Sequence, residues 1–103
     1  MSDDPVKLIL RWDVQSGSET EYSEFIVSDF IPRVNRLGIG DVQFWYTSYG
    51  ECPQIQVELV AESKRQMHNI IRSEEWNSLH ERLSDMVDNL SQKMIKATGS
   101  IQL

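Results

Sequence analysis

Two histidines are the side chains of this 103-residue chain best suited to move a proton at neutral pH. His68 follows Met67 in a stretch with helical spacing, and a histidine that points from there toward the core could act as a general base. His80 comes one helical turn after Trp76, so stacking on that indole is a sufficient reason for its presence. We therefore take His68 as the candidate catalytic residue, with a place at the margin of the core as the alternative.

Aromatic side chains with polar tips supply the candidate ligand contacts. Small-molecule sites combine apolar, aromatic walls with a few polar groups. The hydrophobic pattern sends several such residues to one side of a predicted sheet, namely Trp12, Tyr22, Tyr46, Trp76 and His80. The same set also describes a core rich in aromatic residues, and that is the favoured interpretation.

Composition and charge exclude several other functions. The net charge of -6 argues against nucleic acid and against an anionic membrane surface, because both need a clustered basic surface. Histidine, cysteine and acidic residues do not cluster at the spacing of metal ligands, and no glycine-rich loop follows a strand, so we expect no metal and no cofactor. The single cysteine, Cys52, cannot form an internal disulfide, and no segment suits a signal peptide or a membrane span. We therefore expect a cytoplasmic protein.

Three segments that must position these residues have the alternating pattern of strands. In residues 6–14 one face is wholly apolar, formed by Val6, Leu8, Leu10, Trp12 and Val14. Residues 41–49 and 54–61 alternate in the same way, and the residues between them form a hairpin loop. The apolar face of residues 6–14 should lie under the helices.

The first helix is predicted between residues 18 and 38. Ser18 with Glu21 three residues later has the pattern of a capping box. Pro32 predicts a kink or the end of the regular helix, because proline cannot donate to the helical ladder. Gly38 and Gly40 close the segment.

A second helical region begins at Ser63, where Gln66 occupies the capping-box position. A break near residues 72–73 separates a short helix from a long one. The apolar stripe of the long helix comprises Trp76, Leu79, Leu83, Met86, Val87, Leu90 and Met94. Gly99 ends it, and residues 100–103 form a short edge strand in this interpretation.

The order of these segments, β-α-β-β-α-β, is that of a ferredoxin-like α+β fold. A chain of this length forms one domain, residues 1–103. The topology predicts a four-stranded antiparallel sheet with strand order 4-1-3-2 and both helical regions on one face.

The other face of the predicted sheet needs a cover. It mixes charged and amide residues with apolar ones, among them Ile9 and Trp45. Burying a large apolar side chain stabilises by roughly 1.5–3 kcal/mol, so a homodimer that packs sheet against sheet is the simplest cover. Arg11 could then pair with Glu58 or Asp13, within one subunit or between two. A monomer with a partly solvated sheet is the alternative.

These features resemble the dimeric α/β-barrel superfamily, which includes antibiotic-biosynthesis-type monooxygenases, stress-responsive barrel proteins and haem-degrading monooxygenases. The resemblance covers nearly the whole chain. It rests on the first strand, the aromatic strand Phe44-Trp45-Tyr46, and the segment Ser73-Glu74-Glu75-Trp76 that opens the long helix. It implies a homodimer with a ligand pocket between sheet and helices in each subunit. The first strand lacks the asparagine of the haem-degrading members, which argues against haem degradation.

The resemblance leaves two functions open, and a purely structural role is a third possibility. The first is a small-molecule-binding or accessory protein without catalysis, which is favoured because no catalytic constellation is visible. The alternative is a cofactor-independent, monooxygenase-like enzyme that acts on a hydrophobic or aromatic substrate. In that case His68 is the proton acceptor, and Tyr46 and Trp76 position the ring.

Overall fold

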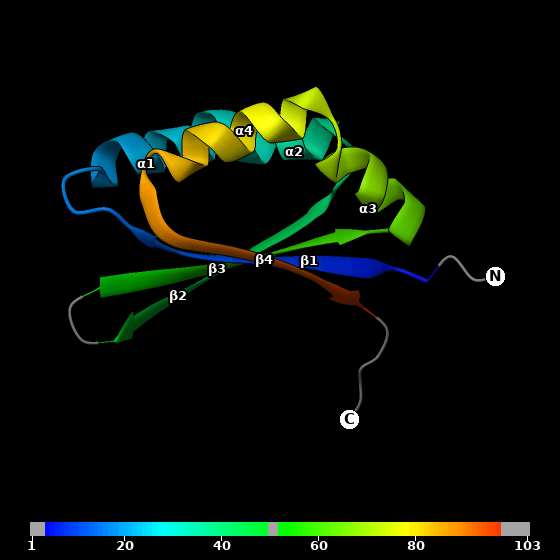
Figure 1. The fold of residues 1–103 in the computed structure, drawn as a ribbon, viewed down its shortest axis with the longest axis horizontal. Coiled ribbons are helices and arrows are strands. Elements are labelled where there is room, and N and C mark those ends of the chain that lie inside the picture. The colour runs from blue at the N-terminus through cyan, green and yellow to red at the C-terminus, as the bar shows by residue number, and fades with distance from the viewer. Residues whose placement is uncertain (1–3, 50–51, 98–103) are drawn as a thin grey trace.

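The strands form one antiparallel sheet, and the helices lie on a single face of it, as Figure 1 shows. This computed structural model describes residues 4–49 and 52–97. The strands are β1 (Val6–Val14), β2 (Asp41–Tyr49), β3 (Cys52–Ala61) and β4 (Val87–Lys96). The helical segments are α1 (Glu19–Phe25), the π-helical η1 (Ile26–Phe30), α2 (Ile31–Arg36), α3 (Lys64–Ile71) and α4 (Glu74–Ser84). The sheet order β2-β3-β1-β4 confirms the predicted strand order and the ferredoxin-like α+β class.

Strand β1 carries the centre of the core. It pairs with β3 along one edge and with β4 along the other. Its alternate residues Leu8, Leu10 and Trp12 are fully buried, as the apolar face in the sequence predicts. Because successive side chains of a strand point to opposite faces, the residues between them lie on the side of the sheet away from the helices.

The first helical segment changes its hydrogen-bond pattern ahead of Pro32. Regular α-helix ends at Phe25, the wider π-helical turn of η1 follows, and α-helix resumes at Ile31. In a regular helix the proline ring collides with the carbonyl group four residues earlier, which here belongs to Ser28. A wider turn relieves that contact, so the chain continues as a helix instead of breaking. The predicted interruption near Pro32 is therefore confirmed as a π-helical turn.

Gly38 ends this segment with a left-handed φ of 112°. The N–H of Gly38 donates to the carbonyl of Asn35 at 3.1 Å, and the N–H of Ile39 donates to that of Val34 at 3.3 Å. These two bonds are the pair that defines a Schellman C-cap. A Cβ at Gly38 would also lie 2.8 Å from Nε2 of Gln66. The predicted stop at this glycine is confirmed.

Serine caps both helices of the second helical region. Ser63 Oγ accepts the N–H of Gln66, and Ser73 Oγ accepts the N–H of Trp76, each at 3.1 Å. The predicted start at Ser63 and the predicted break between α3 and α4 are confirmed.

The predicted capping box at Ser18 is wrong. Within the described residues the Ser18 side chain makes no cap hydrogen bond, and its φ and ψ of -107° and 8° are not those of an extended cap residue. The Glu19 carboxylate instead accepts the N–H of Gly17 at 3.0 Å. The N–H of Ser18, which Glu21 was expected to accept, donates instead to the carbonyl of Gln15 at 3.0 Å.

The long helix predicted from Trp76 to Gly99 is also wrong, because α4 ends at Ser84 and residues 87–96 form β4. Val87, Leu90 and Met94 have helical spacing, yet all three contact the core from a strand. The pairing of β4 with β1 shifts register opposite residues 11–13, and Asn89 there has a φ of 58°. An irregularity of this kind inserts an extra residue into a strand. It brings residues three apart in the sequence to the same face.

Sheet pairing explains why the chain leaves the helix. Strand β1 would otherwise present one edge of unpaired backbone N–H and carbonyl groups next to a hydrophobic core, and β4 pairs with that edge over residues 6–14. This partner is distant in sequence, so local spacing cannot reveal it. The strand predicted at residues 100–103 lies outside the described residues.

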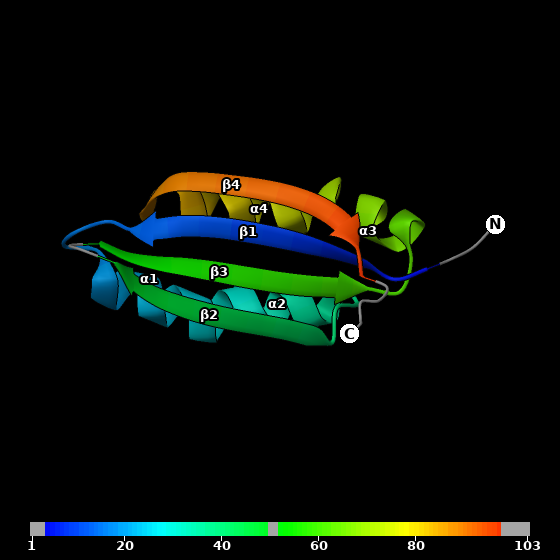
Figure 2. The same ribbon diagram turned by 90° about the horizontal axis from the view of Figure 1, so that it is seen from below.

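Figure 2 shows the open face of the sheet, which the helices leave uncovered. Lys7 Nζ lies 2.9 Å from Glu58 Oε1, and Gln56 Nε2 donates to Glu58 Oε2 at 2.9 Å. Arg11 Nε donates to Gln56 Oε1 at 2.8 Å. Within the chain Arg11 therefore binds Gln56, which is its pairing partner in β3, and not Glu58. Beside this polar string Trp45 is 45% exposed and Ile95 is 39% exposed.

Candidate functional site

A continuous series of rings lies between the sheet and the helices. Ring centroids are 6.2 Å apart for Tyr22 and Trp12, 6.5 Å for Trp12 and Phe30, and 6.2 Å for Phe30 and Trp76. His80 continues the series 6.2 Å beyond Trp76. The planes are tilted or edge-on, the arrangement that aromatic quadrupoles favour. We call these five residues the aromatic series.

The aromatic series joins four of the predicted ligand residues into one structural unit. Its three middle rings, Trp12, Phe30 and Trp76, are buried, whereas Tyr22 and His80 at its ends are half-buried. The middle of the series is thus part of the core, as the favoured interpretation of the sequence requires. Only its ends can present polar atoms to a ligand.

At one end of the series the indole Nε1–H of Trp12 donates to the hydroxyl oxygen of Tyr22 at 3.0 Å. Trp12 is fully buried, so this N–H needs a protein partner. Burial raises the pKa of Tyr22 to about 12, and the hydrogen bond from Trp12 opposes that shift in part. The hydroxyl is therefore neutral at physiological pH. Within the described residues it donates no hydrogen bond, so its proton is available to a ligand.

Tyr46 extends the same row of the sheet to its edge. Trp12 and Tyr46 both pair with Ile55 of β3, so all three share the helix side of the sheet. Two strand spacings separate the backbones of Trp12 and Tyr46 by about 10 Å. Tyr46 is 67% exposed and its neighbour on this side, Phe44, is 37% exposed. The helices thus leave an aromatic strip uncovered along the edge strand β2.

The two histidines lie in different surroundings. His80 of α4 packs on Trp76 with an interplanar angle of 50°, the stacking that their spacing predicts. His68 of α3 is exposed. Within the described residues no ring contact or side-chain hydrogen bond links His68 to the aromatic series. The structure therefore groups His80, and not His68, with the candidate ligand residues.

Phe30 is the member of the series that sequence reasoning missed. In the sequence Phe30 is one more apolar residue of an amphipathic helix. In the structure its ring contacts Trp12, Trp76 and Phe25. The signal that could have found it is its place two residues before Pro32. The π-helical turn there rotates the chain and directs this ring between β1 and α4.

In the described part of the chain, histidine, cysteine and acidic residues form no group of three or more that could hold a metal ion. None of the helices described is both long enough and apolar enough to cross a bilayer.

Comparison with known proteins identifies the fold. No family model matches the sequence, and no curated protein matches it either. Among solved structures, SnoaB, a cofactor-independent oxygenase from Streptomyces nogalater, has a TM-score of 0.76 at 11% identity, covering 95% of this chain and 97% of SnoaB. A hypothetical Arabidopsis thaliana protein has a TM-score of 0.75 at 18% identity, covering 100% of this chain and 97% of that one.

A third solved structure, of a candidate antibiotic biosynthesis monooxygenase from Bacillus cereus, has a TM-score of 0.68 at 16% identity. It covers 97% of this chain and 99% of that one. At these identities the likeness shows the fold. The chain therefore has the fold of the dimeric α/β-barrel superfamily, as the resemblance in its sequence predicts.

Proposed function

We propose that this protein is a small-molecule-binding protein of the dimeric α/β-barrel type that holds a hydrophobic, ring-bearing ligand on the helix side of its sheet. The observation that carries the proposal is the hydroxyl group of Tyr22. It is half-buried, fixed by Trp12, neutral, and keeps an unused proton beside aromatic surface. Apolar walls with a few convergent polar groups are typical of ligand sites.

The exposed strip of Phe44 and Tyr46 supplies the wall at this end of the aromatic series. A flat ligand stacked on these rings would accept the proton of Tyr22 through a carbonyl or hydroxyl oxygen. At the opposite end His80, which packs on the buried Trp76, offers a second, smaller contact. The proposed ligand contacts are therefore Tyr22, Tyr46 and His80, and the buried Trp12 and Trp76 position Tyr22 and His80.

Titration calorimetry with naphthol as a ring-bearing probe tests this site. We expect Tyr22→Phe to weaken binding about fivefold, because a neutral hydrogen bond contributes about 1 kcal/mol. Tyr46→Ala should weaken it by removing stacking area, and His80→Ala reports whether the other end binds instead. Val27→Ala is the matched control, since Val27 is 69% exposed and apolar but lies on the outer surface of η1. Binding that none of the three site variants weakens would contradict the proposal.

We also propose that the protein is a homodimer that packs its open sheet faces together, in the cytoplasm. Support for the dimer comes from Trp45 and Ile95, whose exposure leaves apolar area uncovered. Lys7 and Glu58 neutralise each other within the chain, which lowers the cost of burying that pair. The single cysteine supports a cytoplasmic location, because it cannot form an internal disulfide and disulfides are typical of secreted proteins.

Sedimentation velocity at micromolar concentration tests the dimer. We expect twice the chain mass of 12.0 kDa for the native protein and a monomer for Trp45→Glu. Val27→Glu places the same charge on the helical layer and should stay dimeric. A native protein that sediments only at 12.0 kDa would contradict this part of the proposal.

A cofactor-independent oxygenase is the second candidate function, because SnoaB has the same fold and is described as such an oxygenase. We propose His68 as its base, as the sequence suggests, and His80 as the competing candidate, since His80 is half-buried against Trp76. Oxygen uptake with hydroquinone-type substrates tests the activity. Uptake that falls in His68→Ala but not in His80→Ala supports the first assignment, and the reverse supports the second. No uptake leaves the binding function alone.

A further inference from the structure

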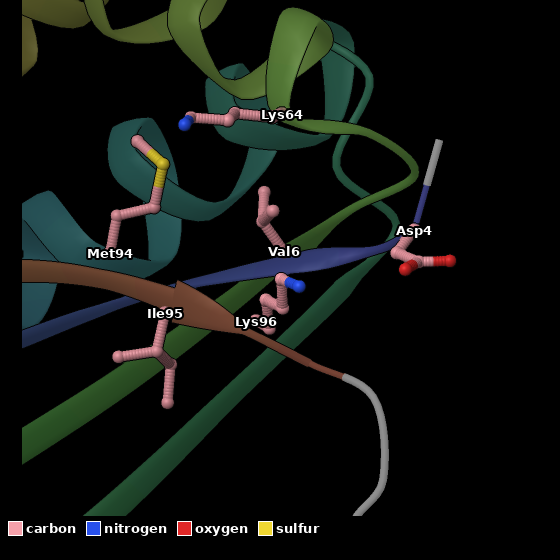
Figure 3. A pocket seen from close by; sticks show the side chains of 6 residues that line it. All are labelled: Asp4, Val6, Lys64, Met94, Ile95 and Lys96. Atoms are coloured by element: carbon pink, nitrogen blue, oxygen red, sulfur yellow. The ribbon is translucent and has the colours of Figure 1, made fainter. Parts of the chain in front are cut away.

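A pocket of about 320 Å³ lies at the opposite end of the sheet from the Tyr22 hydroxyl. It is lined by Asp4, Val6, Lys64, Met94, Ile95 and Lys96, and Figure 3 shows how these side chains lie. Lys64 and Met94 point toward the same space, whereas Ile95 points to the other side of β4. Val6 is buried and Met94 packs against the core, so the floor of the pocket is apolar. The volume is at the lower end of the range of small-molecule sites.

The charge at this pocket differs from that of the whole protein. The chain carries a net charge of -6, yet this pocket has two ammonium groups, Lys64 and Lys96, and one carboxylate, Asp4. Within the described residues neither lysine has a carboxylate oxygen within 4.0 Å, and the Asp4 carboxyl points away from both in Figure 3. Both cations are therefore available to an anion that enters the pocket.

In Figure 3 the Lys64 ammonium points toward Met94 and the Lys96 ammonium points the other way, so the two cations mark different parts of the pocket rim. Among the described residues Lys7, Arg33 and Arg36 have ion pairs, whereas Lys64 and Lys96 have none and line a pocket with an apolar floor. The pocket thus combines a positive rim with an apolar base. This combination is complementary to a molecule that carries a negative head on an apolar body.

We propose that this pocket binds a small organic anion, a carboxylate attached to an apolar chain or ring. The carboxylate binds at the rim that carries Lys64 and Lys96, and the apolar body lies on Val6 and Met94. The site is separate from the proposed aromatic site, because Val6 and Trp12 stand near opposite ends of β1. It therefore does not depend on the function proposed above.

The methionine methyl groups provide a direct readout of binding at this position. Of the methionines in the described residues, Met94 lines the pocket, whereas Met67 and Met86 are buried elsewhere in the core. We would label the methyl groups with ¹³C, assign the Met94 signal with Met94→Leu, and titrate the intact chain with octanoate. The Met94 signal should move and saturate at millimolar octanoate, while the Met67 and Met86 signals stay in place.

Two further probes separate charge from apolar contact. Octylammonium has the same chain with the opposite charge and should leave the Met94 signal unmoved. Acetate has the same head without the chain and should bind at least tenfold more weakly than octanoate. In Lys64→Gln/Lys96→Gln the dissociation constant for octanoate should rise about tenfold, equivalent to about 1.4 kcal/mol. Lys93→Gln is the matched control, because it removes one charge from β4 on the open face.

Each of the following results would overturn the proposal. A Met94 signal that does not move with octanoate removes the site. Equal responses to octanoate and octylammonium, or unchanged affinity in the double lysine variant, show that the lysines do not recognise an anion. If Lys93→Gln weakens binding as much as the double variant, the effect is one of net charge and not of this pocket.

Discussion

Replacing Tyr22 with phenylalanine removes one hydroxyl group and keeps the ring packing against Trp12. The indole N–H of Trp12 donates to that hydroxyl at 3.0 Å and is fully buried, so the variant leaves it without its partner. An unsatisfied buried donor costs about 1–3 kcal/mol. We therefore expect Tyr22→Phe to lower the free energy of unfolding at pH 7 by about 2 kcal/mol. Urea denaturation at one fixed protein concentration measures it, since association would make the value concentration-dependent.

Tyr46→Phe is the matched control. It removes the same hydroxyl group from a side chain that is 67% exposed, so the change should stay within about 0.5 kcal/mol. A double-mutant cycle with Trp12→Phe isolates the hydrogen bond, because the cost of the smaller ring appears in both backgrounds. We expect a coupling of about 1 kcal/mol between Trp12 and Tyr22.

The same hydroxyl predicts a dependence on pH. The pKa of Tyr22 is 10.0 in an ordinary setting and about 12 in the folded chain, so the folded state holds the proton more tightly. The resulting stabilisation is complete below pH 10 and is lost as the pH rises through 12. Two pKa units correspond to about 2.7 kcal/mol, and screening at a half-buried ring reduces this to about 1–2 kcal/mol. The advantage of the wild type over Tyr22→Phe should shrink by that amount between pH 10 and 12.

Two outcomes would refute this reasoning. If Tyr22→Phe is no less stable than Tyr46→Phe at pH 7, the Trp12 N–H does not depend on the Tyr22 hydroxyl. If absorbance at alkaline pH shows every tyrosine ionising near pH 10, the hydroxyl of Tyr22 is solvated and not held in the helix layer.

Three further predictions concern the helix ends and one ion pair. Gly38→Ala should lower the free energy of unfolding by about 1–2 kcal/mol in thermal or urea unfolding, because the φ of Gly38 is 112° and the new Cβ would meet Gln66. Gly40→Ala should change stability little, because a Cβ at Gly40 would have no atom of the described residues within 4 Å. Ser73→Ala should cost about 1 kcal/mol through loss of the cap bond to Trp76, whereas Ser18→Ala, which loses no cap bond within the described residues, should cost much less. The hydrogen bond from Arg33 lowers the pKa of Glu75, so the NMR titration midpoint of Glu75 should rise in Arg33→Gln. The stability that this ion pair adds should be lost as the pH falls through the lowered pKa of Glu75. Equal effects of the two glycine variants, equal effects of the two serine variants, or an unmoved Glu75 midpoint would each contradict the corresponding argument.

The sequence determined the features of this protein that depend on neighbours along the chain. Alternating residues predicted β1, β2 and β3, and glycine and serine signals marked the end at Gly38 and the starts at Ser63 and Ser73. The order of these elements was enough to predict the sheet order. Short-range spacing carries this information because the period of a helix or strand is repeated every few residues.

Tertiary structure alone decided what depends on partners distant in sequence. Residues 87–96 have helical spacing, but the free edge of β1 draws them into the sheet, and the irregularity near Asn89 reconciles the two patterns. Phe30 joins the aromatic series only because the chain widens to a π-helical turn before Pro32. The pocket between Lys64 and Lys96 likewise unites residues 32 positions apart. No local pattern reports such contacts, because hydrogen bonds and packing between distant segments override the weaker preferences of each segment for its own conformation.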